Sequence, residues 1–90
     1  MLQDALIHFL DNINDSWVID SGASFHATPN MKYFQDYVQG YFGHVYLVDD
    51  ESCKIVGMGK IYIKLNNGNQ WLLKEVRHVP NLKRNLISIG

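Results

Sequence analysis

Apolar and polar residues alternate in short runs over the second half of the chain, a pattern typical of β-strands with one buried face. Polar, turn-forming segments separate the runs, and the Asn-Asn-Gly-Asn sequence at 66–69 is the clearest tight turn. The pattern predicts one hairpin over residues 45–56 with a polar tip at 49–52. It predicts a second hairpin with strands at 61–65 and 71–79. This half of the chain therefore reads as all-β.

The first half is less regular. Unbroken apolar residues predict a buried strand at 16–20, and another strand should begin at 23–25. Thr28 and Pro29 are good residues for the N-cap and the first turn of a helix. Apolar residues then recur at steps of three and four, which predicts a short amphipathic helix or turn; they are Met31, Phe34, Tyr37 and Val38.

The two ends of the chain are compatible with more than one structure. Residues 1–10 carry apolar side chains at helix-like spacing without a clear cap, so they could form a helix or a strand, and 11–15 is a polar break. Residues 81–90 could form one helical turn or finish as a strand. We therefore expect an N-terminal flanking segment or processing junction at 1–15 and one domain at 16–90.

Composition narrows the class of protein. A chain of 90 residues fits one small domain, which buries a limited share of its surface and often relies on a partner. A hydrophobic content of 47% argues against disorder, and a net charge of −1 disfavours binding to nucleic acid or a membrane surface. The single Cys53 excludes an internal disulfide framework and suits a reducing compartment. No apolar run approaches the roughly 20 residues that span a bilayer, and the N-terminus lacks a signal-peptide pattern.

Asp20, Ser21 and Gly22 directly follow the first apolar strand and carry the clearest chemical signal. Aspartic proteases present a catalytic carboxylate in this way. The strand carries the acid into the site, the glycine allows a close backbone approach, and the hydroxyl can brace the loop. This chemistry needs two carboxylates that share a proton, and the chain has one such motif. The motif therefore predicts a homodimer in which each chain supplies one Asp20.

These residues also have ordinary structural interpretations. An Asp in a Ser-Gly context is commonly a turn residue, and Ser21 could be a plain turn hydroxyl. The histidines fit no usual zinc spacing and Cys53 has no thiol partner, so we expect no metal and no cofactor; the histidines are His8, His26, His44 and His78. His26, six residues after Asp20, could influence the acid or simply pack locally.

Two further groups are better explained by structure than by ligand binding. Gly57-Met58-Gly59 interrupts the alternation, and a β-bulge or strand crossing fits it better than a phosphate-binding loop. A modest basic cluster near the end of the chain is expected to be a solvated strand face rather than an RNA contact; its members are Lys74, Arg77, His78, Lys83 and Arg84.

Three segments carry a resemblance to a known family: WVIDSGASFH at 17–26, GMG at 57–59 and VRHVPNLKRNLIS at 76–88. In order and spacing they are similar to the protease domain of copia-type LTR retrotransposons. That domain is a retropepsin-like aspartic protease within a Gag-Pol polyprotein. The resemblance covers residues 16–90, nearly the whole chain.

The resemblance implies an all-β fold: a small closed β-barrel of the retropepsin (acid protease) type with one or two short helices, forming an obligate or weak homodimer. It implies an aspartic endopeptidase that cleaves the element's own polyprotein, in the cytoplasm within virus-like particles. Asp20 matches the catalytic position and Ser21 the residue that links the two active-site loops. Gly22 and Ala23 match the backbone that contacts substrate.

The family also closes a hairpin flap over its substrate, and we place this flap at 45–56. Gly57-Met58-Gly59 is the alternative position for the tip. The residues assigned to substrate closure are Val45, Tyr46, Leu47, Val48, Asp49, Asp50, Glu51 and Ser52.

The implied mechanism follows from charge. Two carboxylates about 3 Å apart cannot both ionise, so one acts as base on a water while the other polarises the scissile carbonyl. Two other classes of function stay open. One is a non-catalytic β-barrel interaction module derived from a retroelement, and the other is an RNA-binding accessory module, which the near-neutral charge disfavours.

Overall fold

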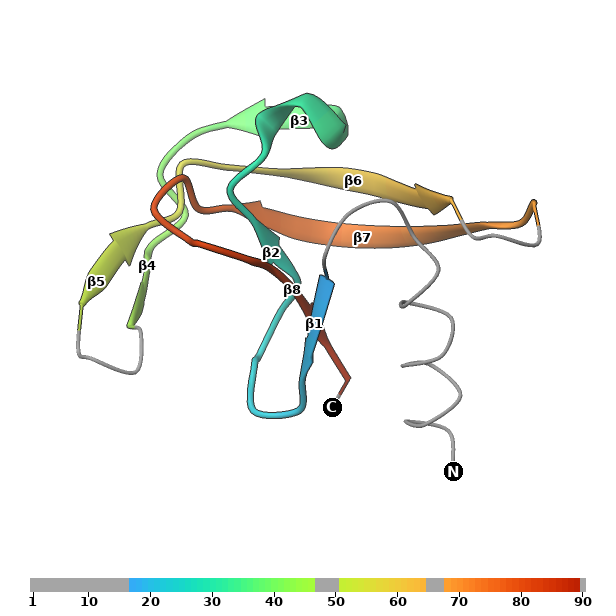
Figure 1. The fold of residues 1–90 in the computed structure, drawn as a ribbon. Helices are drawn as coiled ribbons and strands as arrows, with labels where there is room; N and C mark the ends of the chain where they lie inside the picture. Colours follow the sequence, from blue (N-terminus) through green and yellow to red (C-terminus); the bar gives the residue numbers. More distant parts are fainter. Residues whose placement is uncertain (1–16, 47–50, 65–67, 90) are drawn as a thin grey trace.

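The computed structural model describes residues 17–46, 51–64 and 68–89, and the predicted flanking segment 1–15 lies outside them. The described chain is almost entirely β (Figure 1), which confirms the all-β prediction. Its elements in chain order are β1 (Trp17–Asp20), β2 (Ala27–Thr28), the 3-10 turn η1 (Met31–Tyr33), β3 (Phe34–Gln39), β4 (His44–Tyr46), β5 (Ser52–Lys54), β6 (Gly57–Lys64), β7 (Gln70–His78) and β8 (Asn85–Ser88).

Six strands form one sheet in the order β1-β8-β2-β7-β6-β3, and β4 and β5 form a separate hairpin (Figure 1). β8 pairs in parallel with β1, with Ser88 opposite Asp20, and antiparallel with β2, with Leu86 opposite Ala27. β2 is parallel to β7, whereas β6 is antiparallel to both β7 and β3. The first and last described strands therefore lie side by side.

The sheet does not close into a barrel in the part of the chain that is described. β1 and β3 are its two edges, and no pairing joins them. Closure requires strands long enough to tilt and stagger around a common axis. β2 has only two residues in the middle of the sheet, and β1 has four. The predicted closed barrel is therefore seen here as an open, mixed sheet.

Of the predicted short amphipathic helix or turn, only a turn forms, and the helix is wrong. A single 3-10 turn forms at Met31–Tyr33, and the chain continues as the edge strand β3 against β6. The β3–β6 register shifts around Asp36, which has a positive φ of 53°, so the strand contains a β-bulge. The bulge leaves Phe34 and Tyr37 both half-buried with ring centroids 5.1 Å apart. Their three-residue spacing imitates a helix in the sequence.

A second register shift occurs on the other side of β6, in its pairing with β7. The β6–β7 register shifts between Gly59 and Ile61, where β7 has one extra residue near Glu75, whose φ is 55°. The bulged residues therefore lie on the neighbouring strands β3 and β7, and not at 57–59 where the sequence predicted a β-bulge. The glycines of β6 face the bulged strand β3. A Cβ on Gly57 would collide with the ring and hydroxyl of Tyr37, and one on Gly59 would lie 2.9 Å from a ring carbon of Phe34. Because this segment is part of β6, the alternative flap tip at 57–59 is wrong.

Two buried apolar clusters hold the elements together. The first packs β6, β7 and β8 and receives Ile19 from β1; its buried members are Ile61, Ile63, Leu73, Val76 and Ile87. The second joins the β4–β5 hairpin to the sheet and receives Phe25 and Val45; its buried members are Ala27, Cys53, Ile55, Val79 and Leu82. The segment from β1 to β2, which contains Asp20, is therefore anchored to one cluster before the loop and to the other after it.

Both predicted hairpins are confirmed by their strand pairing, β4 with β5 and β6 with β7. The C-terminal segment finishes as strand β8, one of the two structures that the sequence allows. Among the described residues, no helix has the length and apolar character needed to cross a membrane.

Candidate functional site

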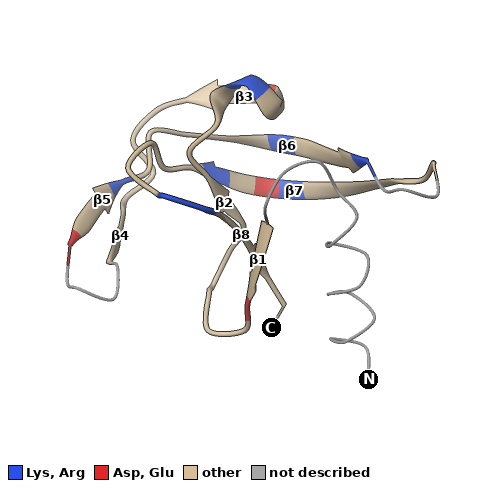
Figure 2. Cartoon of the chain, in the orientation of Figure 1, with Lys and Arg blue, Asp and Glu red and all other residues tan. Residues whose placement is uncertain are grey.

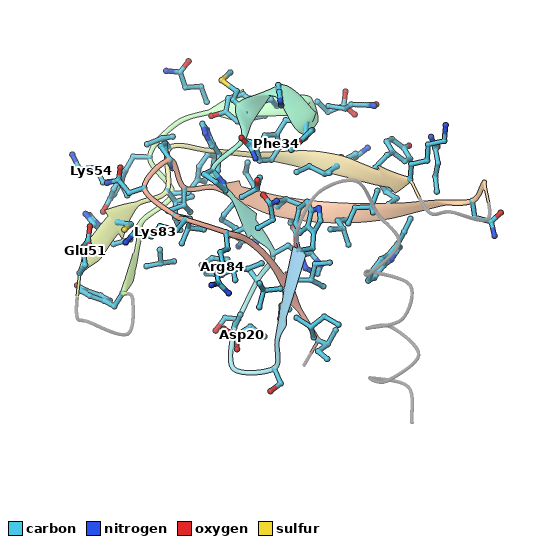
Figure 3. The ribbon with its side chains drawn as sticks, viewed as in Figure 1. Asp20, Phe34, Glu51, Lys54, Lys83 and Arg84 are labelled. Carbon is cyan, nitrogen blue, oxygen red and sulfur yellow. The ribbon has the colours of Figure 1, made fainter. Side chains whose placement is uncertain are left out.

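Asp20 ends β1 and is exposed at the lower side of the molecule in Figure 3. The Gly22 N–H donates a hydrogen bond of 2.8 Å to its Oδ1. The Ala23 N–H donates a bond of 3.2 Å to its main-chain carbonyl. The three strand residues before Asp20 are half-buried, so a packed strand ends in a tight turn that orients the carboxylate.

Glycine is suited to position 22 because the backbone there passes close to the Asp20 carboxylate. A Cβ at this position would lie 3.3 Å from Oδ1 of Asp20, tighter than most side chains tolerate. The positive φ values among described glycines belong to Gly43 and Gly68. Glycine is therefore suited to this position because it lets its own amide reach the carboxylate, not because of a left-handed backbone.

Strand β8 braces the Asp20 loop from the side. Ser88 lies opposite Asp20 in the parallel ladder. Its hydroxyl donates a 2.7 Å hydrogen bond to the carbonyl of Ala23, and its N–H donates a 3.1 Å bond to Nδ1 of His26. One residue of β8 therefore holds the loop near its beginning and near its end.

The surroundings of His26 favour a neutral ring. Its main-chain carbonyl accepts a 2.9 Å hydrogen bond from the Arg77 N–H. The Arg77 guanidinium lies 4.7 Å from the centre of the Phe25 ring and donates a 2.7 Å bond to the carbonyl of Glu75. Burial, followed by the positive charge of Arg77, lowers the pKa of His26 below its usual value of 6.5. Because Nδ1 accepts from Ser88, the proton of the neutral ring resides on Nε2.

A second hydrogen bond between the β2 and β8 regions is more deeply buried. The Thr28 hydroxyl donates to Oδ1 of Asn85 and accepts a 3.1 Å bond from the Asn30 N–H. Both side chains in the first bond are buried. Thr28 thus satisfies a backbone N–H two residues on, as a capping hydroxyl does, but it lies in β2. The N-cap of the single 3-10 turn is Asn30, so the helix start predicted at Thr28 and Pro29 is wrong.

The predicted loop residues lie together, with Ser21 and Gly22 exposed and Ala23 half-buried directly after Asp20. Of the residues assigned to the flap, Val45, Tyr46 and Ser52 lie on the β4–β5 hairpin and Glu51 directly precedes β5. Leu47, Val48, Asp49 and Asp50 lie outside the described residues.

The hairpin is firmly attached at one side and exposed at the other. Val45 pairs with Cys53, which is fully buried, and both pack in the second core cluster. Tyr46 pairs with Ser52 and is 75% exposed. In Figure 1 the hairpin and the Asp20 loop point toward the same side of the molecule. The hairpin is therefore anchored to the core through Val45 and Cys53, and its role as a flap stays a prediction.

The described histidines have separate neighbours. His26 bonds Ser88, His44 contacts the Tyr41 hydroxyl, and His78 contacts the Tyr37 hydroxyl at 2.7 Å. Within the described ranges no group of three potential metal ligands comes together. The contacts of the described histidines are thus local packing and hydrogen bonds.

The predicted basic cluster is divided in the structure. His78 is buried and Arg77 stacks on Phe25, whereas Lys74, Lys83 and Arg84 are exposed. Figure 2 shows Lys and Arg distributed over several strands and the loop before β8. The described charges do not gather into the single basic face that binding to a nucleic-acid backbone favours.

Sequence reasoning missed Ser88 and Asn85 as supports of the loop. Both lie in the final segment that carried the family resemblance, which is the one signal that pointed to them. Their partners are 57 to 65 residues earlier in the chain. No periodicity connects residues at such separations.

Residues 17–90 match a protein family described as "Pol polyprotein, beta-barrel domain". Over 79 residues, 88% of the chain, the sequence is 48% identical to the retrovirus-related Pol polyprotein from transposon TNT 1-94 of Nicotiana tabacum. The chain spans 6% of the length of that relative. No solved structure matches the chain.

Proposed function

The chain belongs to the family of Pol polyprotein beta-barrel domains, and from this premise we propose that it is an aspartic endopeptidase that processes a retrotransposon Gag-Pol polyprotein. Two chains form the enzyme as a homodimer, and each contributes one Asp20. The 48% identity to a transposon Pol polyprotein supports the assignment to a retrotransposon. Peptide-bond hydrolysis is inferred from the residues around Asp20.

The observation that carries the proposal is the way Asp20 is presented. Its carboxylate is exposed at the end of a packed strand, and Oδ1 is oriented by the Gly22 N–H. Among the described residues, no side chain pairs with the carboxylate. The loop itself is fixed by Ser88 and by the two core clusters. A rigid, exposed carboxylate is suited to meet its symmetry copy across a dimer axis.

The chemistry follows once two such carboxylates meet. Like charges about 3 Å apart cannot both ionise, so the pair holds one proton. The ionised member takes a proton from a bound water, and the protonated member polarises the scissile carbonyl. The pair titrates as a unit, so the rate should be bell-shaped in pH. No metal or cofactor takes part in this mechanism.

The β4–β5 hairpin closes over the substrate in this proposal. Its base is fixed through Cys53, and its exposed side chains, such as Tyr46, are available to an extended polyprotein segment. The substrate is the element's own polyprotein, cleaved in the cytoplasm within virus-like particles. No membrane or nucleic-acid partner is required.

The test is cleavage of the polyprotein that contains this chain, measured from pH 4 to 8 at several concentrations. Wild type is compared with Asp20→Asn and with Asp36→Asn. Asp36 is a suitable control because it is exposed, and Asn tolerates its positive φ. The proposal predicts that Asp20→Asn alone abolishes cleavage and that specific activity rises with concentration. Cleavage by Asp20→Asn at the wild-type rate would refute it.

A non-catalytic interaction module is the second candidate, and the exposed aromatic residues near the hairpin favour it. Tyr41, Phe42 and Tyr46 are 65%, 39% and 75% exposed, and such side chains are common in binding sites. In this case wild type and Asp20→Asn would both fold and neither would cleave the polyprotein at any concentration.

A further inference from the structure

At the end of β8, the main-chain N–H of Ser88 bonds a side chain of the Asp20 loop instead of the carbonyl of a neighbouring strand. Strand β2 begins at Ala27, which lies opposite Leu86, so β2 does not extend alongside Ser88. The N–H of Ser88 is satisfied by Nδ1 of His26 at 3.1 Å, in place of a carbonyl. Its hydroxyl reaches the carbonyl of Ala23 at 2.7 Å. The end of β8 is thus joined to the loop by two bonds, one of which depends on a titratable ring.

We propose that His26 and Ser88 are positioning residues that form a latch on the Asp20 loop, and that this latch holds only while the His26 ring is neutral. Neither residue touches the reacting atoms. Their effect reaches the carboxylate through Ala23, whose N–H bonds the Asp20 carbonyl and whose own carbonyl accepts from Ser88.

Protonation opens the latch for a simple geometric reason. A neutral ring with its proton on Nε2 has a lone pair at Nδ1 that can accept from Ser88. An imidazolium has N–H groups at both positions. The Ser88 N–H would then face another donor, and a half-buried amide would lose its partner, which is unfavourable. The ring must rotate away or β8 must shift, and either movement frees the loop.

Burial of the ring and the charge beside it explain why the ring stays neutral at a lower pH than a free histidine. On β7, Arg77 lies next to His26 through a main-chain hydrogen bond, and its guanidinium is held by the Phe25 ring and the Glu75 carbonyl. β8 presents the uncharged Ser88, and within the described residues the loop's own Asp20 forms no ion pair with the ring. Burial and the Arg77 charge lower the pKa of His26. The latch therefore stays closed at a pH where a free histidine would be charged.

This arrangement matters for the proposed enzyme, and that part of the inference rests on the proposed function. An aspartate pair with one shared proton works in acidic solution. A histidine at its usual pKa would open the latch in the same range. Burial of the ring, together with the Arg77 charge, thus extends the working range of the site toward lower pH.

The latch can be tested without any cleavage, in the Asp20→Asn chain, where the acid at the centre of the loop no longer titrates. We would follow the ring of His26 and the amides of Ala23 and Ser88 by NMR from pH 8 to 4.5. The latch predicts that both amides shift with the same midpoint as the ring. It also predicts that the protection of the Ser88 amide hydrogen, taken relative to its intrinsic exchange rate at each pH, falls by about tenfold or more below that midpoint. Amides that stay constant while His26 titrates would overturn the inference.

Two substitutions at the ring provide matched controls in the same experiment. His26→Asn keeps an acceptor, Oδ1, at the same bond separation from Cα as Nδ1 but cannot titrate. His26→Leu keeps comparable bulk and removes the acceptor. Strong protection of the Ser88 amide at all pH values in His26→Asn, with weak protection in His26→Leu, supports the latch. Equal exchange in the two variants contradicts it.

Cleavage kinetics then test the link to catalysis. Arg77→Gln should move the acidic limb of the kcat profile to higher pH, because His26 then protonates earlier. Ser88→Ala should lower kcat by about 10- to 100-fold with KM nearly unchanged, and Ser88→Thr should restore it. An unchanged acidic limb in Arg77→Gln would overturn the catalytic role of the latch. Absence of cleavage in wild type would instead contradict the proposed enzyme and leave the NMR test of the latch intact.

Discussion

Thr28 and Asn85 are 57 residues apart and share a buried side-chain hydrogen bond that joins β2 to β8. The same hydroxyl accepts from the Asn30 N–H. This bond lies beside the latch that Ser88 and His26 form on the Asp20 loop. The two contacts fasten β8 to the first third of the chain at neighbouring positions.

We predict that Thr28→Val destabilises the fold by about 1–3 kcal/mol, because it removes two hydrogen bonds from a buried position while keeping the side chain's shape. Denaturant unfolding monitored by tryptophan fluorescence measures the change. Thr28→Ser retains the hydroxyl and should lose clearly less stability. Equal stability of Thr28→Val and wild type would show that the bond contributes nothing net.

Gly57 should tolerate no side chain. A Cβ there would collide with Tyr37, whose hydroxyl contacts His78, so Gly57→Ala must displace this aromatic cluster. We expect a loss of about 1–3 kcal/mol from overpacking, measured by thermal unfolding. Gly40→Ala is the matched control, because its Cβ would make an ordinary 3.5 Å contact with the Phe42 ring. A loss at Gly40 equal to that at Gly57 would refute the steric explanation.

The stability of the fold should fall as pH falls below about 6.5, in part through His26. The pKa of His26 is lowered in the folded chain by burial and by Arg77. The unfolded chain therefore takes up the proton first, and the free energy of unfolding decreases until the folded pKa is passed. His26→Asn should show a shallower decrease between pH 7 and 5 in urea titrations. Parallel curves for the two proteins would contradict this contribution.

Tyr46→Ala should leave stability nearly unchanged, because the side chain is 75% exposed, but it should raise the KM for polyprotein cleavage if the hairpin contacts substrate. Tyr62→Ala is the control, since Tyr62 is 44% exposed and lies on β6, in the other sheet. Steady-state kinetics on both variants measure the difference. An equal KM for the two variants would argue against the hairpin as the substrate cover.

The alternating strands β6 and β7 were predictable, whereas the bulged edge strand β3 was not. β6 and β7 follow from alternation around Ile61 and Ile63 and from the tight turn that joins them. β3 was predicted as a short helix or turn because the bulge at Asp36 places Phe34 and Tyr37 on one side at a spacing of three. The sequence contains that spacing but not the backbone angle that causes it.

The candidate site was predictable only in its local part. Asp20 and Gly22 are two residues apart, so their turn follows from the residue types. The parallel pairing of β1 with β8 and the bonds of Ser88 connect distant parts of the chain. Local patterns carry no information on such contacts. The open sheet also depends on how short β1 and β2 are, and strand ends are the least certain part of any prediction from sequence.

The side-by-side arrangement of β1 and β8 also sets an order of events during synthesis. A ribosome makes β1 and the Asp20 loop first, but the strand that braces this loop appears 65 residues later. Contacts between such distant segments form late in folding. A nascent chain therefore carries its acidic loop unsupported until β8 has emerged. In a polyprotein, this delay would keep the site incomplete until the whole domain has left the ribosome.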